Sequence, residues 1–150
     1  MTNKEELNNF FEICFTSILR VEERALESIT NSKLTIKEIH FIEAVFRAKA
    51  RGENCFSTIA AFLGITIGTL TSSFARLEKK GYLIKEQDPH DKRIFYIVPT
   101  RLAELINKEH TRFHEKMVDS IVKLLSETQL DELVRALKNL ETFFEEFSLN

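Results

Sequence analysis

The sequence has 150 residues, 43% hydrophobic and 29% charged, which is enough apolar material for one folded domain and excludes a disordered chain. The formal net charge of −2 excludes binding to nucleic acid through bulk basic charge, so such a partner would have to meet a local basic segment. No run approaches a membrane span, and the N-terminus has no apolar signal core, so we expect a cytoplasmic protein without membrane contacts.

Apolar residues at helical spacing predict two helices in the first third of the chain. The first is long. The second opens at Thr35 and Glu38, a capping-box pair that exchanges side chain-to-backbone hydrogen bonds, and Gly52 lies in the polar break after it. The apolar positions are Leu7, Phe10, Phe11, Cys14, Ile18 and Val21 in the first helix and Ile39, Ile42 and Phe46 in the second.

A short helix, a tight turn and a longer helix follow. Ser57 is expected to cap the short helix, which runs to Leu63, and Gly64 is expected to end it. After a turn at 64–66, the longer helix runs over 67–80 and stops at Gly81. The apolar face of this longer helix is formed by Ile67, Leu70, Phe74 and Leu77.

A β-hairpin and two more helices complete the chain. Residues 82–86 and 94–98 are rich in β-branched and aromatic side chains and flank the polar loop 87–93. Pro99 and Thr100 open a fifth helix, and the capping-box segment 126–129 opens the last one. The last helix has a coiled-coil-like apolar seam of Leu130, Leu133, Leu137, Leu140, Phe144 and Phe147.

These elements predict a mainly α fold with a small β-hairpin wing. Two helices joined by a tight turn and followed by a basic hairpin are typical of a winged helix-turn-helix, whose second helix enters the major groove of DNA. Charge supports this interpretation, because residues 66–101 hold seven Lys/Arg against four Asp/Glu, a net +3, while the remainder is −5. We expect one unit, with residues 35–99 as the DNA-binding core and residues 1–34 and 100–150 as dimerisation helices.

Several residue types in this core suit DNA. Gly68 lets the backbone approach closely, serine and threonine hydroxyls can bond phosphates, Arg76 can read guanine through two hydrogen bonds, and Lys92 or Arg93 can reach a minor groove. A plain solvated surface is the alternative. The predicted DNA-binding residues are Ser57, Thr66, Gly68, Thr69, Thr71, Ser72, Ser73, Arg76, Lys79, Lys80, Lys92 and Arg93.

The run STIAAFLGITIGTLTSSFARLEKKGYLIKEQDPHDKRIFYIVPT resembles the winged-helix core of the MarR family of bacterial transcriptional regulators. Its most specific part is the wing signature DxxDxR, present as Asp88-Pro-His-Asp91-Lys-Arg93. Pro99 replaces the usual leucine and Ala103 a frequent glycine, both outside the DNA-reading positions. The resemblance implies that Asp88 and Asp91 brace the wing and that Arg93 touches DNA. It also implies a homodimer on a palindromic operator in double-stranded DNA.

Within the family, segments 36–40, 65–73 and 112–118 resemble the FabT-like branch, which represses fatty-acid biosynthesis genes in Gram-positive bacteria. That resemblance implies a long-chain acyl group on acyl carrier protein as co-repressor. An apolar crevice lined by Phe46, Phe113 and Met117 could take the chain. Apolar residues at helical spacing more often belong to ordinary core packing than to a pocket.

Five other hypotheses stay open or are set aside. Cys14 could sense peroxide, but the second helix has Phe41 and no tyrosine to bond a thiolate, so we interpret Cys14 as a small core residue. His110 and His114, spaced four apart, could bind a metal with His40, but we predict packing and no metal or cofactor. A small aromatic effector, or a protein-interaction module that does not bind DNA, is also compatible. No catalytic motif supports an enzyme.

Overall fold

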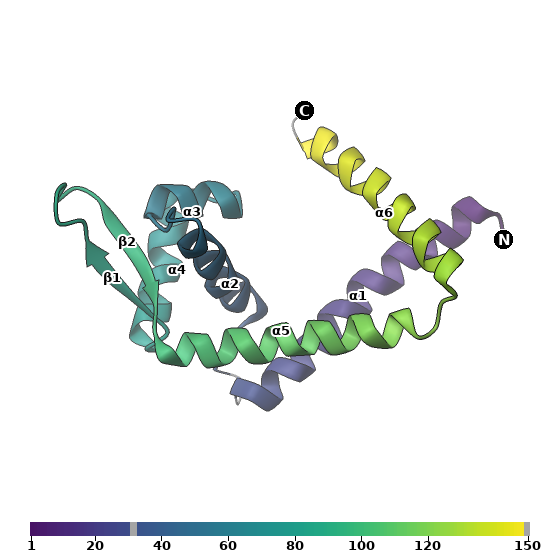
Figure 1. Cartoon of the computed structure of the whole chain (residues 1–150), viewed down its shortest axis with the longest axis horizontal. Coiled ribbons are helices and arrows are strands. Elements are labelled where there is room, and N and C mark those ends of the chain that lie inside the picture. Colours follow the sequence, from purple (N-terminus) through teal and green to yellow (C-terminus); the bar gives the residue numbers. More distant parts are fainter. Residues whose placement is uncertain (31–32, 149–150) are drawn as a thin grey trace. The chain divides into compact units, whose positions relative to one another are not determined.

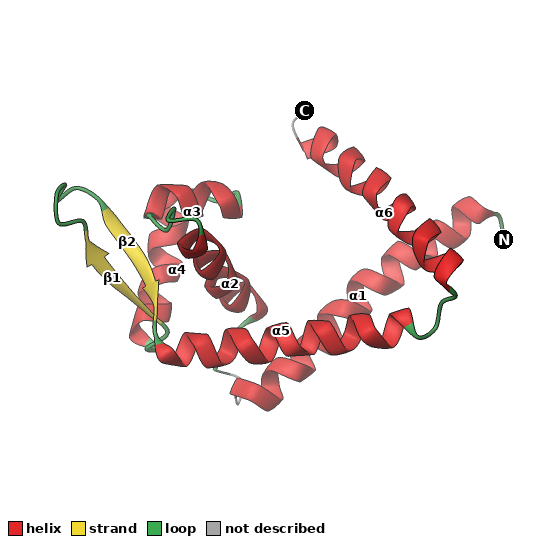
Figure 2. Ribbon diagram, viewed as in Figure 1, coloured by secondary structure: helices red, strands yellow, loops and turns green. Residues whose placement is uncertain are grey.

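A computed structural model describes residues 1–30 and 33–148 (Figure 1). Two compact units make up the chain, Met1–His110 and Thr111–Asn150. Among the described residues the sheet is a two-stranded hairpin and the other elements are helices (Figure 2). The elements are α1 (Asn3–Thr30), α2 (Ile36–Ala50), α3 (Phe56–Leu63), α4 (Ile67–Lys79), β1 (Leu83–Gln87), β2 (Phe95–Pro99), α5 (Arg101–Val122) and α6 (Glu127–Ser148).

The core of the first unit gathers side chains from α2, α3, α4 and the hairpin, which lie together in Figure 1. Each helix contributes one apolar stripe, and the strands contribute Leu83 and Ile97, so the elements can shield these side chains from water only by packing together. The strands pair antiparallel from Leu83 opposite Pro99 to Gln87 opposite Phe95. The fully buried apolar side chains include Ile39, Ile42, Val45, Ile59, Leu70, Leu77, Leu83 and Ile97.

Local signals set most helix ends as expected. Thr35 and Glu38 form both hydrogen bonds of the capping box that begins α2. Gly64 follows α3 with φ +65°, a left-handed conformation that glycine adopts without steric cost. The expectation that Ser57 caps α3 is wrong, because Cys55 occupies the N-cap position and Ser57 lies inside the helix. The expectation that Ile67 belongs to the buried apolar face of α4 is also wrong, because its side chain is 56% exposed.

The N-terminal helix and the last helix each leave large apolar side chains on the surface. In the first unit, α1 exposes Phe10, Ile13, Phe15, Ile18, Leu19 and Val21. In the second unit, α6 begins at the expected capping box of Ser126 and Gln129 and exposes Leu133, Val134, Leu137, Phe143, Phe144 and Phe147. Burying such faces is favourable, so each helix offers a surface for a further partner. Within the described residues, no single helix is long and apolar enough to cross a membrane; α3 and α4 reach that threshold only together, and they bend by 105°.

A buried ion pair joins α2 to the end of α4. Lys80 Nζ donates to both carboxylate oxygens of Glu38, at 2.9 and 2.8 Å. Burial alone would raise the pKa of Glu38, but the hydrogen bond from Lys80 and the backbone bond from Thr35 together hold it below its ordinary value. The Glu38 carboxylate is therefore charged in the folded state and depends on Lys80 for its partner.

Replacing Lys80 by Met should lower the free energy of unfolding by about 1–3 kcal/mol at neutral pH, because it leaves a buried carboxylate short of its partner. The loss should stay below that of a fully buried pair, since the Lys80 side chain is 37% exposed to solvent. Urea unfolding followed by circular dichroism measures it. Lys79→Met, on the exposed neighbouring lysine, is the control and should have little effect.

The sign of the pH dependence follows from the lowered pKa of Glu38. Its contribution is complete above 4.5, the ordinary value of the unfolded carboxyl group, and is lost as the pH falls through the lower folded value. The difference between wild type and Lys80→Met should therefore be largest near neutral pH and shrink in acid. A difference that stays constant down to strongly acidic pH would contradict a charged Glu38.

Candidate nucleic-acid interface

The helix-turn-helix presents the polar side of α4 to solvent. Thr66 begins α4 as its N-cap, with Oγ1 accepting a hydrogen bond from Thr69 N at 3.1 Å. Leu70, Phe74 and Leu77 are buried, and the helical repeat of 3.6 residues turns the opposite positions outward. The exposed residues of this face are Gly68, Thr69, Thr71, Ser72, Arg76 and Lys79, and Ser73 is half-buried beside them.

Short hydrogen bonds within α4 organise this face. The hydroxyl groups of Thr71 and Ser72 donate to the carbonyl oxygens of Ile67 and Gly68, one turn earlier. Arg76 Nη2 donates to Ser73 Oγ at 3.1 Å. These hydroxyls keep acceptor lone pairs, and Arg76 keeps further N–H donors, so the face can both donate to and accept from a ligand.

Two hollows flank α4. One, of about 460 Å³, lies between the start of α3, the start of α4 and the hairpin, and brings together Ser57, Thr71 and Arg93 of the predicted residues. The other, of about 500 Å³, lies between α2 and α4 and brings together Thr69, Ser73 and Arg76. Residues far apart in the sequence thus border one surface around α4, as groove recognition of DNA requires.

Two aspartates hold the hairpin tip in one conformation. Asp88 Oδ1 accepts from the backbone N–H groups of His90 and Asp91, and Asp88 Oδ2 accepts from the Tyr96 hydroxyl at 2.8 Å. Asp91 accepts from the backbone N–H of Arg93 and from its Nε and Nη2, at 3.0 to 3.1 Å. Hydrogen bonds from Asp91 N–H and Tyr96 lower the pKa of Asp88, and those from Arg93 lower the pKa of Asp91. Both aspartates are therefore anionic acceptors: Asp88 fixes the backbone of the tip, and Asp91 fixes the exposed Arg93.

Some predicted residues occupy other surroundings. Lys80, expected to contact DNA, gives its ammonium group to Glu38 instead, because Glu38 is buried and needs a cation. Lys92 is exposed at the hairpin tip. Cys14 is half-buried on α1, so its interpretation as a core residue is wrong for the single chain. Phe46 packs against the core of the first unit, whereas Phe113 and Met117 are half-buried in the second, and a shared acyl crevice stays a prediction.

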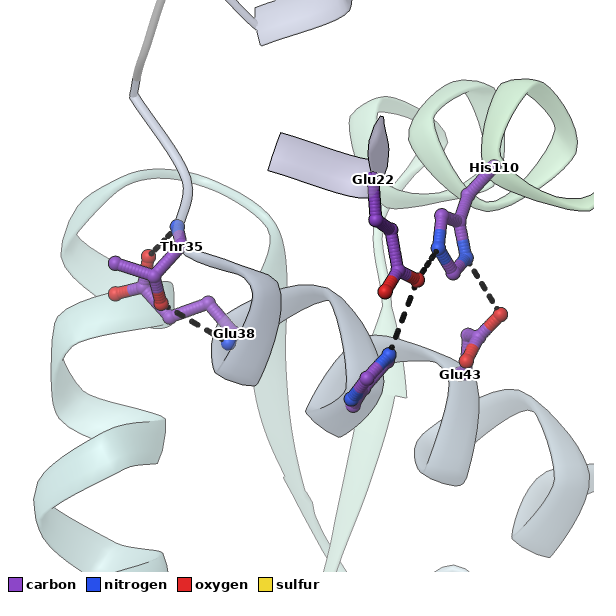
Figure 3. A network of polar contacts seen from close by, with 6 residues as sticks. Glu22, Thr35, Glu38, Glu43 and His110 are labelled. Atoms are coloured by element: carbon purple, nitrogen blue, oxygen red, sulfur yellow. Dashed lines mark hydrogen bonds and ion pairs between the residues drawn. The ribbon is translucent and has the colours of Figure 1, made fainter. Parts of the chain in front are cut away.

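A partly buried polar cluster of four residues in the first unit brings His40 and His110 together, two of the three histidines considered as metal ligands, and adds Glu22 and Glu43, which the sequence analysis did not single out (Figure 3). His110 on α5 has a carboxylate on each ring nitrogen, Glu22 at Nε2 and Glu43 at Nδ1, both at 2.7 Å. His40 Nε2 also lies 3.3 Å from Glu22. Burial works to lower the pKa of His110, but the two carboxylates outweigh it, and the net pKa is raised. One signal in the sequence could have indicated this cluster. Glu22 is a carboxylate four residues before the buried Leu26, so both side chains lie on the same side of α1.

The geometry of α3, α4 and the hairpin defines a winged helix-turn-helix, a fold typical of DNA-binding proteins. A sequence model described as the MarR family matches residues 42–95. A Bacillus subtilis (strain 168) protein described as the uncharacterized HTH-type transcriptional regulator YkoM is 26% identical over 140 residues, covering 91% of this chain and 88% of the relative. Residues 42–95 are therefore similar to the MarR family, and nearly the whole chain is similar to an HTH-type transcriptional regulator.

Solved structures agree along nearly the whole chain. Streptococcus pneumoniae FabT in complex with DNA superposes with a TM-score of 0.88 at 29% identity, covering 97% of this chain and 99% of FabT. The Staphylococcus aureus MepR–DNA complex, at 18% identity and a TM-score of 0.74, shares the fold and covers 95% of this chain and 99% of MepR. The likeness to FabT therefore supports the FabT-like branch of the family.

Gly68 gives a direct test of the α4 surface. A Cβ there would meet only Thr66 Oγ1, at 3.9 Å, so nothing inside the chain requires glycine. Gly68→Ala should therefore raise the free energy of unfolding by about 0.4–1 kcal/mol. It should also weaken DNA binding several-fold if the backbone approaches DNA, as measured by thermal melting and fluorescence anisotropy.

Gly81→Ala is the matched control, because its φ of +86° strains any residue with a Cβ and the change should lower stability. A Gly68→Ala variant that is more stable and binds DNA with unchanged affinity would show that the backbone at this position stays away from DNA.

Proposed function

We propose that the protein is a homodimeric repressor that places α4 in the major groove of a palindromic operator and its hairpin wing at the adjacent minor groove. The observation that carries this proposal is the agreement over 97% of the chain with FabT in complex with DNA. The exposed polar face of α4 and the braced wing supply the chemistry, and such a regulator acts on DNA in the cytoplasm. Half-sites about one helical turn apart match a two-fold dimer.

Each part of the surface takes a distinct role in this proposal. Arg76 reads a base edge, because a guanidinium can donate two hydrogen bonds to guanine. Lys79 and the hydroxyls of Thr69, Thr71, Ser72 and Ser73 bind phosphates or base edges and fix the register of the helix. Ser57 and Thr66 lie at helix N-termini, where the dipole favours a phosphate, and Gly68 allows close approach. Lys92 and Arg93 insert at the minor groove, where negative potential attracts cations.

The dimer is proposed to form through the apolar faces of α1 and α6. Each helix exposes at least five large apolar side chains, and a monomer of this size gains stability when such surfaces leave water. A two-fold interface would use the same patches on both subunits. Cys14 lies on this face of α1, half-buried between the exposed Ile13 and Phe15.

The regulated genes are proposed to be those of fatty-acid synthesis, with a long-chain acyl group on acyl carrier protein as co-repressor. This rests on the resemblance to the FabT-like branch and on the 29% identity with FabT. The acyl protein can act only by binding the DNA-competent conformation more tightly than the free one. Its presence should therefore tighten operator binding.

The role of Arg76 can be tested by substitution. Arg76→Ala should weaken operator binding by about 1–3 kcal/mol and weaken random DNA less, because a base contact contributes only on the right sequence. Anisotropy titrations on both DNAs measure the difference. Arg47→Ala, on the exposed side of α2 and outside the hollows that flank α4, is the matched control. Equal losses on both DNAs would reduce Arg76 to a phosphate contact.

The co-repressor is tested by anisotropy on palindromic DNA from fatty-acid synthesis promoters, with and without long-chain acyl carrier protein. Tighter binding with the acyl protein, and no change with the unacylated carrier, supports the proposal. Unchanged operator binding would keep the DNA-binding regulator and remove the acyl signal. Absence of specific binding on these promoters would call for operator selection from random DNA, and failure there would overturn the repressor.

A further inference from the structure

The cluster around His110 brings together residue types that commonly bind metal ions. Glu22 on α1, His40 on α2 and His110 on α5 each offer one ligand atom, and these atoms all lie within 4.8 Å of one another. Glu22 and His110 are buried, at 3% and 1% exposure. Two imidazole nitrogens and one carboxylate oxygen form a ligand set that zinc and similar divalent ions prefer.

We propose that Glu22, His40 and His110 bind one divalent transition-metal ion of the zinc type. Glu22 Oε1 lies 2.7 Å from His110 Nε2 and 3.3 Å from His40 Nε2, so all three atoms can reach one ion through small side-chain movements. The ion takes the place of the proton between His110 Nε2 and Glu22, and that proton is released to solvent. Three protein ligands leave a fourth position for water or another donor.

Glu43 orients the histidine for this role. Its Oε1 lies 2.7 Å from His110 Nδ1 and accepts a hydrogen bond from Nδ1–H, which leaves Nε2 directed at Glu22 and His40. A carboxylate on the far nitrogen of a metal-bound histidine fixes the tautomer and the ring orientation and raises the basicity of the ligand. Glu43 is therefore a positioning residue and not a ligand in this proposal. Figure 3 shows Glu43 and Glu22 at opposite nitrogens of the His110 ring.

An ion can reach the site from solvent through His40. The His40 side chain is 47% exposed, in contrast to the buried Glu22, and it borders the hollow between α2 and α4. The three ligands come from three helices, and α2 also holds α4 through Glu38 and Lys80. A bound ion would tie α1 and the start of α5 to the helix that supports the DNA-facing surface. The site does not depend on the proposed operator or co-repressor.

The test is direct metal binding. Untagged protein carrying Cys14→Ser and Cys55→Ser, which removes competing thiols, is stripped with chelator and titrated with Zn²⁺ against a chromogenic competitor. We expect one ion per chain, and Co²⁺ in place of Zn²⁺ should give the intense visible absorption of four-coordinate cobalt. His40→Gln should weaken binding by at least about tenfold. His90→Gln, at the exposed hairpin tip, removes a histidine outside the cluster and should bind as the parent does.

Further variants separate coordination from folding. His40 is half exposed, so His40→Gln should fold even if His110→Gln does not, and circular dichroism checks both. Glu43→Ala should lower affinity by roughly 10–100-fold, and Glu43→Gln, whose amide oxygen can still accept from Nδ1, should recover part of it. Binding that is unchanged in folded His40→Gln, or lost equally in His90→Gln, would overturn the site. Failure of the parent protein to bind one Zn²⁺ per chain would also overturn the proposed site. The cluster would then be a network of hydrogen bonds and ion pairs without a metal.

Discussion

The burial of Leu70, Phe74 and Leu77 is the constraint on which the DNA-facing surface depends. These three side chains fix the rotation of α4 about its own axis, because exposing any of them would cost roughly 1.5–3 kcal/mol of hydrophobic free energy. Once that rotation is set, Gly68, Ser72, Arg76 and Lys79 cannot avoid facing outward. The surface proposed to face DNA is thus positioned by buried residues that do not belong to it.

The wing obtains its order from a different source. Its tip has little apolar material, and its conformation is held by Asp88 and Asp91, which together accept hydrogen bonds from three backbone amides, one tyrosine hydroxyl and one guanidinium. Asp91 engages two of the five N–H donors of Arg93, so the remaining donors stay available to a ligand while the side chain is held in place. The two aspartates therefore order the wing, and Asp91 limits the motion of the Arg93 side chain.

Helix α2 connects the separate parts of the first unit. Near its start it holds the end of α4 through Glu38, and further along His40 and Glu43 face the polar cluster shared with α1 and α5. Both connections use buried carboxylates, whose charge is costly unless a cation or a hydrogen-bond donor satisfies it. The cluster and the Glu38–Lys80 pair therefore share α2, the helix that holds the end of α4. This arrangement gives a physical link between the N-terminal helix and the DNA-facing surface.

The sequence by itself determined the features that arise from neighbouring residues. Helical periodicity, the capping boxes at Thr35 and Ser126, the left-handed glycine at 64 and the polar loop between two β-rich runs predicted the element order and the winged helix, because each signal acts over a few residues. The local patterns gave wrong predictions at two places, where they buried Ile67 and began α3 at Ser57. Only the tertiary structure decided that Lys80 turns to Glu38, 42 residues away, and that Glu22 meets His110 across 88 residues. Such pairings depend on how helices pack against one another, and no spacing along the chain records that geometry.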